Sequence, residues 1–236
     1  VSARRRQRAL ERVAGLETPV EVVELGALAE VCDVVVECCP AAVFRQVAEP
    51  ALRAGRTLVA LSVGALLEHQ DLVDLAGAAG GRIVVPTGAL IGLDAVRAAA
   101  EGDIRSLSMV TRKPPGSFAG APFIEQNGID LDRLTAPLKI FEGNVRQAVR
   151  GFPANVNVAV ALGLAGIGAD ATRIEIWADP ALTRNTHTIE VEADSARFEM
   201  HIENVPSEEN PRTGRIVALS VIATLRALAS PLRIGT

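Results

Sequence analysis

The sequence contains no tyrosine, one tryptophan and six phenylalanines, and its formal net charge is −4. Proteins that bind single-stranded nucleic acid stack bases on aromatic side chains and follow the phosphates with basic residues. Neither feature is present in quantity, which argues against nucleic acid as a partner. Hydrophobic residues nevertheless make up 49% of the 236 residues, enough for a folded core and too many for a disordered chain.

Cysteine is also scarce, with three residues, of which Cys38 and Cys39 are adjacent. Such a set builds no disulfide framework, and no histidine or cysteine stands near these residues at metal-ligand spacing. We therefore expect free, buried thiols in a reducing compartment and no metal site.

Long uncharged runs are absent except at residues 151–169, which approach the length of a membrane-spanning helix. This run contains Pro153, Asn155, Asn157 and several glycines, and no second run accompanies it. A buried helix explains it better. The first residues, Val-Ser-Ala-Arg-Arg-Arg, do not resemble a signal peptide, and we expect a soluble, cytoplasmic protein.

The glycine-rich G-x-G-x-x-G turn of dinucleotide-binding folds is missing too. Residues 1–3 resemble the end of a second strand and residues 4–14 the helix that follows it. We therefore expect the chain to start inside a nucleotide-binding fold, without its first strand and phosphate turn.

The same stretch bears on the choice of nucleotide, because NAD-specific folds place an acidic residue after the second strand. No acidic residue precedes Glu11, whereas Ser2, Arg4 and Arg5 suit a 2′-phosphate. The arginines are otherwise typical of the start of a surface helix. We predict that NADP is accepted at least as well as NAD.

The first half of the chain alternates short β-branched runs with helical segments. Strands are expected at residues 20–25, 33–38, 57–63 and 82–87, and helices at residues 41–54 and 65–79. This alternation predicts an α/β, doubly wound parallel sheet of Rossmann type, incomplete at its amino end. Gly64 and Gly88 lie in turns after the strands, where such sheets bind ligands. The turns are either a ligand-binding edge or only tight connections.

From residue 104 onward the strands alternate in polarity, as in a sheet with one solvated face. Strands are expected at residues 173–178, 188–193 and 197–203, the last two forming a hairpin, with a final helix at 215–229. This predicts an α+β domain with an open, largely antiparallel sheet. We place a dinucleotide-binding domain at residues 1–88 and a catalytic and dimerisation domain at 89–211, with residues 212–236 packing back on the first domain.

Side-chain parity separates the histidines of the hairpin. His187 shares the face of the apolar residues in its strand, whereas His201 lies among outward glutamates. An inward histidine is either a paired core residue or a titrating group in a cleft. Asn155 and Asn157 pose a similar choice, because one asparagine can cap the helix and the other can bind a nicotinamide carboxamide.

Five blocks, in order along nearly the whole chain, resemble the L-aspartate dehydrogenase family. They are LSVGAL (61–66), PTGALIGLDA (86–95), TRKPP (111–115), FPANVNVAVALGLAGIG (152–168) and ADPALTRNTHTIEV (178–191). The resemblance implies a Rossmann domain followed by an α+β domain whose sheet supports homodimer contacts. It also implies NAD(P)-dependent oxidation of L-aspartate to iminoaspartate, which hydrolyses to oxaloacetate and ammonia or feeds NAD biosynthesis.

By this resemblance, His187 corresponds to the active-site histidine of the family, and Ala89 and Asn157 to its cofactor contacts. A dicarboxylate substrate needs cations or N–H donors, and the candidates here are Lys113, Arg184 and Asn185. For the two cations, a plain solvated charge is an equally good interpretation.

Two other interpretations stay open. The dihydrodipicolinate reductase and homoserine dehydrogenase families share the two-domain layout, although their lysine- and histidine-rich substrate motifs are not found. The chain could also be a non-catalytic fragment that has lost half of its nucleotide site. The outward face of the hairpin is either solvated or in contact with a second subunit.

Overall fold

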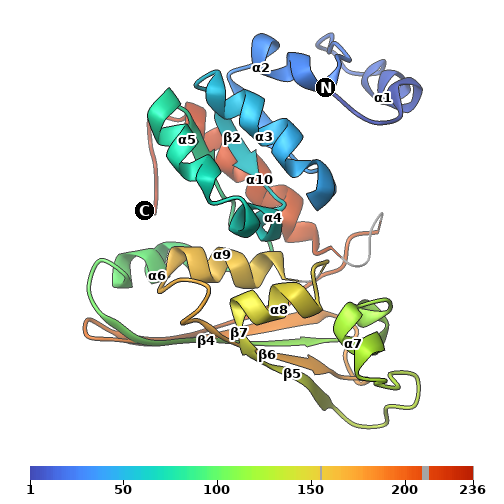
Figure 1. The fold of residues 1–236 in the computed structure, drawn as a ribbon, viewed down its shortest axis with the longest axis vertical. Helices are drawn as coiled ribbons and strands as arrows, with labels where there is room; N and C mark the ends of the chain where they lie inside the picture. The colour runs from blue at the N-terminus through green and yellow to red at the C-terminus, as the bar shows by residue number, and fades with distance from the viewer. Residues whose placement is uncertain (155, 209–212, 236) are drawn as a thin grey trace. The chain divides into compact units, whose positions relative to one another are not determined.

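The computed structural model describes residues 1–154, 156–208 and 213–235. The chain divides into two compact units, Val1–Val85 and Pro86–Thr236. Figure 1 labels the helices and strands of both units.

The first unit is built on a parallel three-stranded sheet, sheet A, in the order β1-β2-β3. Its strands are β1 (Val34–Glu37), β2 (Thr57–Ala60) and β3 (Arg82–Val84). Its helices are α1 (Arg6–Val13), η1 (Leu25–Ala27), α2 (Leu28–Val31), η2 (Ala41–Val43), α3 (Phe44–Arg53), α4 (Val63–Glu68) and α5 (Asp71–Ala79). Helices α3 and α5 lie together on one face of the sheet (Figure 1).

The core of this unit follows from the apolar residues that α3 and β2 share. Phe44, Ala48 and Leu52 recur at helical spacing and are buried against Leu58 of β2. The predicted Rossmann-type parallel sheet is thus confirmed. The single helix expected at residues 65–79 is instead two helices, because the backbone leaves helical geometry at His69, where α4 ends (φ −123°, ψ 50°).

Three predictions for this unit are wrong. Residues 1–3, expected to be the end of a strand, belong to no strand. Residues 20–25 form no strand, because their backbone pairs only briefly, with Val1 donating to Glu21 O and Val23 N donating to Val1 O. The cysteines are not fully buried either, and Cys38 is exposed. Burial and a hydrogen bond to Glu37 raise the pKa of the Cys39 thiol to about 12.

The second unit is built on a five-stranded sheet, sheet B, in the order β5-β6-β4-β7-β8. Its strands are β4 (Ile104–Lys113), β5 (Leu138–Asn144), β6 (Arg173–Ala178), β7 (Asn185–Ala193) and β8 (Arg197–Asn204). Its helices are α6 (Leu93–Ala99), η3 (Pro115–Phe118), α7 (Pro122–Gln126), α8 (Val145–Gly151), α9 (Asn157–Ala165) and α10 (Arg215–Ala229). Only β4 and β6 run parallel, so the predicted, largely antiparallel sheet is confirmed.

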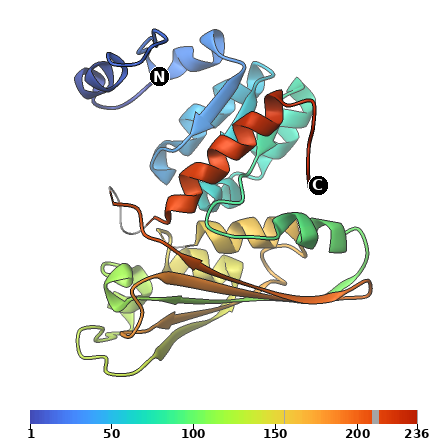
Figure 2. The same ribbon diagram turned by 180° about the vertical axis from the view of Figure 1, so that it is seen from behind.

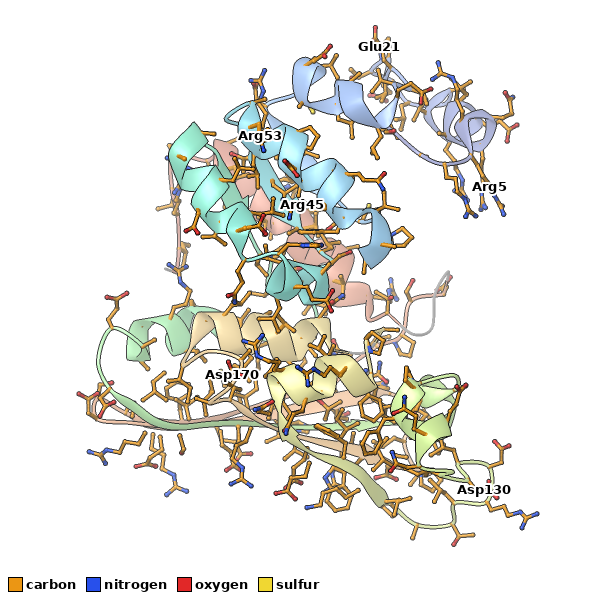
Figure 3. All side chains as sticks on the ribbon, viewed as in Figure 1. Arg5, Glu21, Arg45, Arg53, Asp130 and Asp170 are labelled. Carbon is orange, nitrogen blue, oxygen red and sulfur yellow. The ribbon has the colours of Figure 1, made fainter. Side chains whose placement is uncertain are left out.

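Sheet B has a covered face and an open face. Figures 1 and 2 show α6, α8 and α9 on one face, which we call the inner face. On this side the buried residues of β4 and β7 alternate as expected, for example Leu107, Met109, Ile189 and Val191. Figure 3 shows charged and polar side chains projecting from the opposite, outer face.

Local sequence also explains the helices of this unit. Asn144 caps α8 in a reciprocal capping box with Gln147. The uncharged run predicted as a buried helix is α9, whose residues 159–163 are buried. Among the described residues, no helix is long and apolar enough to cross a membrane. Helix α10 has the predicted bounds, and four residues of its apolar stripe, Ile216, Leu219, Ile222 and Leu225, are exposed.

Candidate functional site

His187 lies on the inner face of sheet B, where strand parity predicted it. It is 2% exposed, and it stands directly opposite Thr111 in the antiparallel ladder of β4 and β7. The Nδ1 atom of its ring lies 3.0 Å from Thr111 Oγ1. Burial, with smaller effects from the charges of Lys113 and His201, lowers the pKa of His187 to about 3. The imidazole is therefore neutral across the physiological pH range.

Lys113 is the last residue of β4 and lies on the same inner face, two residues beyond Thr111. It is 6% exposed, and its Nζ atom lies 6.0 Å from the centre of the Phe118 ring. Burial lowers the pKa of this ammonium to about 8. Since an anion nearby would favour the charged form, the position suits the carboxylate of a ligand.

Asn185 begins β7 on the parity of His187 and pairs with Asn204 at the end of β8. Asn204 is buried, and its Nδ2 donates to the carbonyl oxygen of Ala89 at 3.1 Å. Sequence reasoning missed Asn204, although extending the alternation of β8 by one step beyond Glu203 would place it inward. Hence Ala89, predicted as a cofactor contact, is tied to the strand that pairs with the His187 strand.

The turn that contains Ala89 is held from a second side. The backbone N–H of Gly88 donates to Ser220 Oγ of α10 at 3.1 Å, and Ser220 is buried. Gly88 has a φ of +62°, which favours glycine, and a Cβ at this position would meet no atom within 4 Å. The turn is thus held by a hydrogen bond of its backbone, and the space beside the Cα atom of Gly88 is unfilled.

The other predicted residues of the second unit are accessible. Asn157 is exposed as the first residue of α9, and Val156 rather than an asparagine occupies the N-cap position. Arg184 is exposed, one residue before β7. Asn155 lies outside the described residues.

In the first unit, a buried carboxylate connects the carboxyl ends of two strands of sheet A. Glu37, 1% exposed, accepts hydrogen bonds from Ser62 N at 3.0 Å, Ser62 Oγ at 2.9 Å and Cys39 N at 2.8 Å. A buried carboxylate satisfied by backbone N–H groups is a rigid feature. The turns after β1 and β2, expected to form a ligand-binding edge, are thereby held together.

The residues of this unit that were predicted to contact the nucleotide differ in their exposure to solvent. Gly64 lies in the first turn of α4 and is buried. A ligand therefore has no open space beside it, in contrast to Gly88. Ser2 is half-buried, and Arg4 and Arg5 are exposed just before α1. Figure 3 labels Arg5 at this end of the helix.

The arrangement in the second unit combines a neutral buried imidazole, a buried cation and two asparagines. It can accept or donate a proton at His187 and neutralise an anion at Lys113. Among the described residues, no group of three or more His, Cys, Asp or Glu side chains is placed to hold a metal ion.

Comparison with known proteins agrees along the chain. The family profile described as aspartate dehydrogenase, C-terminal, matches residues 94–228, and the homoserine dehydrogenase NAD binding domain matches residues 1–86. L-aspartate dehydrogenase of Bradyrhizobium diazoefficiens is 60% identical over 222 residues, which are 94% of this chain and 79% of that protein.

Two further relatives extend the similarity. L-aspartate dehydrogenase 3 of Bordetella bronchiseptica is 56% identical over 236 residues, 100% of this chain and 86% of that protein. The crystal structure of aspartate dehydrogenase from Thermotoga maritima superposes with a TM-score of 0.75 at 25% identity. That alignment covers 95% of this chain and 87% of the other.

Proposed function

Because the chain belongs to the L-aspartate dehydrogenase family, we propose that it oxidises L-aspartate to iminoaspartate with NAD(P) as the oxidant. Iminoaspartate then hydrolyses to oxaloacetate and ammonia. His187 carries the proposal, because it is a buried, neutral base beside a buried cation. The imidazole can accept the proton of the α-ammonium group, and the cation can bind a carboxylate of the amino dicarboxylic acid.

Substrate binding is assigned to Lys113, Asn185 and Arg184. Aspartate brings two carboxylates, and the buried Lys113 ammonium offers one of them a partner away from water. Asn185 is the first residue of β7, and Arg184 directly precedes it; both are assigned to the substrate carboxylates. A bound carboxylate would raise the pKa of Lys113 from about 8, because an opposite charge offsets the cost of burial.

His187 is assigned the proton transfer. The α-ammonium group of aspartate loses one proton before Cα can release a hydride, and a neutral imidazole accepts it. Burial and the Lys113 charge lower the pKa of this imidazole to about 3, below the ordinary value of a histidine. The substrate carboxylates supply negative charge that raises the pKa of the imidazole and makes it a stronger base.

The residues present fit a nicotinamide cofactor, which when bound supplies the hydride acceptor. Gly88 leaves open space at a turn that is anchored through its backbone, and Ala89 follows in that turn. The exposed Asn157 carboxamide both donates and accepts hydrogen bonds, as the nicotinamide amide does. In the first unit, Ser2, Arg4 and Arg5 are assigned to the nucleotide phosphates, and Gly64 only to shaping its turn.

We also propose that the protein is a homodimer and that its product feeds NAD biosynthesis. The family resemblance supports both statements. The first is also supported by the outer face of sheet B, which none of the described helices covers (Figures 1 and 2). The dimerisation role of the second domain, the packing of residues 212–236 and the cytoplasmic location stay predictions.

The test of the proposed function is formation of reduced cofactor from a panel of amino acids. L-aspartate should be the preferred substrate, and His187→Ala should lower its turnover by roughly two to four orders of magnitude, the range for a general base. His201→Ala removes the exposed histidine of the same hairpin and should have little effect. Near-normal turnover of His187→Ala on L-aspartate would contradict the assignment.

A further inference from the structure

The His187 ring has a specific partner on the neighbouring strand. Thr111 and His187 face each other across the ladder of β4 and β7, with Oγ1 and Nδ1 3.0 Å apart. Both residues are buried, and Thr111 is 4% exposed. Since Nδ1 is engaged by Thr111, Nε2 is the ring nitrogen that remains for the substrate.

The tautomer of the ring decides what Nε2 can do. If Nδ1 carries the proton and donates to Thr111, the lone pair of Nε2 is available as a base. If the threonine hydroxyl donates to Nδ1 instead, Nε2 carries the proton and accepts none. Only the first arrangement serves the proton transfer proposed above.

We propose that Thr111 is a positioning residue, whose Oγ1 accepts a hydrogen bond from Nδ1–H of His187 and keeps Nε2 unprotonated toward the substrate. The contact between Thr111 Oγ1 and His187 Nδ1 is independent of the proposed function, whereas the direction of the hydrogen bond rests on that function. In the transfer, a substrate N–H bond breaks and an Nε2–H bond forms, giving an imidazolium. The Nδ1–H···Oγ1 bond persists and strengthens, because its donor becomes charged.

The position of Thr111 suits this role. It lies in β4, the middle strand of sheet B, with β6 on one side and β7 on the other. A β-branched side chain on a central strand has few rotamers, so its oxygen is fixed relative to the facing residue. The neutral threonine also adds no charge to a site that already contains Lys113.

The outer face of the same hairpin contains a matching pair that serves as a control. Thr188 Oγ1 lies 2.8 Å from His201 Nδ1, so the same two atom types are within hydrogen-bond distance. The side chain of His201 is 50% exposed, and its Nε2 lies 3.7 Å from Glu203. Water competes for this ring, so its threonine has no comparable influence on a buried reaction.

The first experiment is a ¹⁵N NMR spectrum of the wild-type protein labelled at histidine. The sequence has three histidines, so the spectrum of His187→Ala identifies the His187 signals by their loss. At neutral pH, Nδ1 should be the protonated nitrogen and Nε2 the unprotonated one. A protonated Nε2 in the wild type would overturn the proposal, whether or not any variant folds.

The second experiment measures kcat and KM for L-aspartate in Thr111→Val, Thr111→Ser and Thr188→Val. Thr111→Val keeps the shape but removes the hydroxyl, and kcat should fall roughly 10- to 100-fold, as expected when a buried polar group loses its partner. KM should change little, because Thr111 does not touch the substrate. Thr111→Ser should restore most of the activity and the wild-type tautomer, and Thr188→Val should retain both.

Equal kcat values for Thr111→Val and Thr188→Val would overturn the positioning role. A failure of Thr111→Ser to restore activity would do the same, since it would point to packing rather than the hydroxyl. If the wild type does not oxidise L-aspartate at all, the proposed function fails, and the NMR spectrum alone then decides the tautomer.

Discussion

Burial lowers the pKa of the Lys113 ammonium to about 8 from an ordinary 10.5, which makes its charge a cost to folding. Between these two pH values the unfolded chain binds more protons than the folded one, so the free energy of unfolding rises with pH. The shift corresponds to about 3 kcal/mol, present as a cost below pH 8.

Lys113→Met should therefore raise the free energy of unfolding at pH 7 by up to about 3 kcal/mol, with the gain shrinking toward pH 10.5. The same variant should lose affinity for L-aspartate, because the carboxylate partner is gone. Urea denaturation at pH 7 and pH 10, with KM measurements, checks both effects. Lys139→Met is the control: this lysine is paired with Glu142 and Glu175, and its removal should not stabilise the protein. A destabilised Lys113→Met at pH 7 would contradict the sign.

The turn after β3 contacts two elements of the second unit: Gly88 N–H donates to Ser220 of α10, and Ala89 O accepts from Asn204 of β8. If this turn contacts the cofactor, Asn204→Ala and Ser220→Ala should each raise its Kd by about tenfold, the effect of one buried unpaired group. Titration of protein with NAD(P)H, followed by fluorescence, measures the Kd. Thr224→Val is the control on α10, because its hydroxyl donates to Ser220 O within the helix. Unchanged Kd values in the two test variants would remove the turn from the cofactor site.

The residues just before helix α1 decide the nucleotide preference if Arg4 and Arg5 bind a 2′-phosphate. Both guanidiniums are exposed before the helix, where cations oppose its dipole and a nearby anion relieves that cost. NADP should bind at least as tightly as NAD, and Arg4→Ala/Arg5→Ala should shift the ratio of the two Kd values toward NAD. Arg8→Ala/Arg12→Ala removes two exposed arginines farther along the chain and should leave the ratio unchanged. A wild type that prefers NAD tenfold would contradict this prediction.

At the scale of the whole molecule, the outer face of sheet B is the surface assigned to the homodimer. Trp177, the single tryptophan, lies on this face with the Arg112 guanidinium 4.6 Å from its ring centre. Light scattering should give twice the 24.8 kDa chain mass, and tryptophan emission should shift on dilution as the dimer dissociates.

Arg112→Glu should weaken the dimer, because it places a like charge among the outward glutamates of this face. Arg53→Glu changes the net charge equally on α3 of the first unit, and it should leave the mass unchanged. A wild-type mass of one chain at all concentrations would overturn the homodimer.

The sequence by itself determined many of the elements, although not the strands β4 and β5, and it determined the inward position of His187. Apolar residues recur at the helical repeat in residues 44–52, and buried and exposed residues largely alternate at the strand repeat in residues 185–193. Both patterns involve only neighbouring residues, so the sequence alone reveals them. Five ordered motifs were also enough to identify the family, which the relatives confirm.

Only the tertiary structure decided which side chains meet. The order β5-β6-β4-β7-β8 sets Thr111 opposite His187, although 76 residues separate them. Asn204 reaches Ala89 across 115 residues, and Glu37 reaches Ser62 across 25. Strand order and register depend on long-range pairing, and a shift of one residue would turn Thr111 and Lys113 to the outer face. The strand expected at residues 20–25 is absent for the same reason, since a strand needs a neighbour as well as β-branched residues.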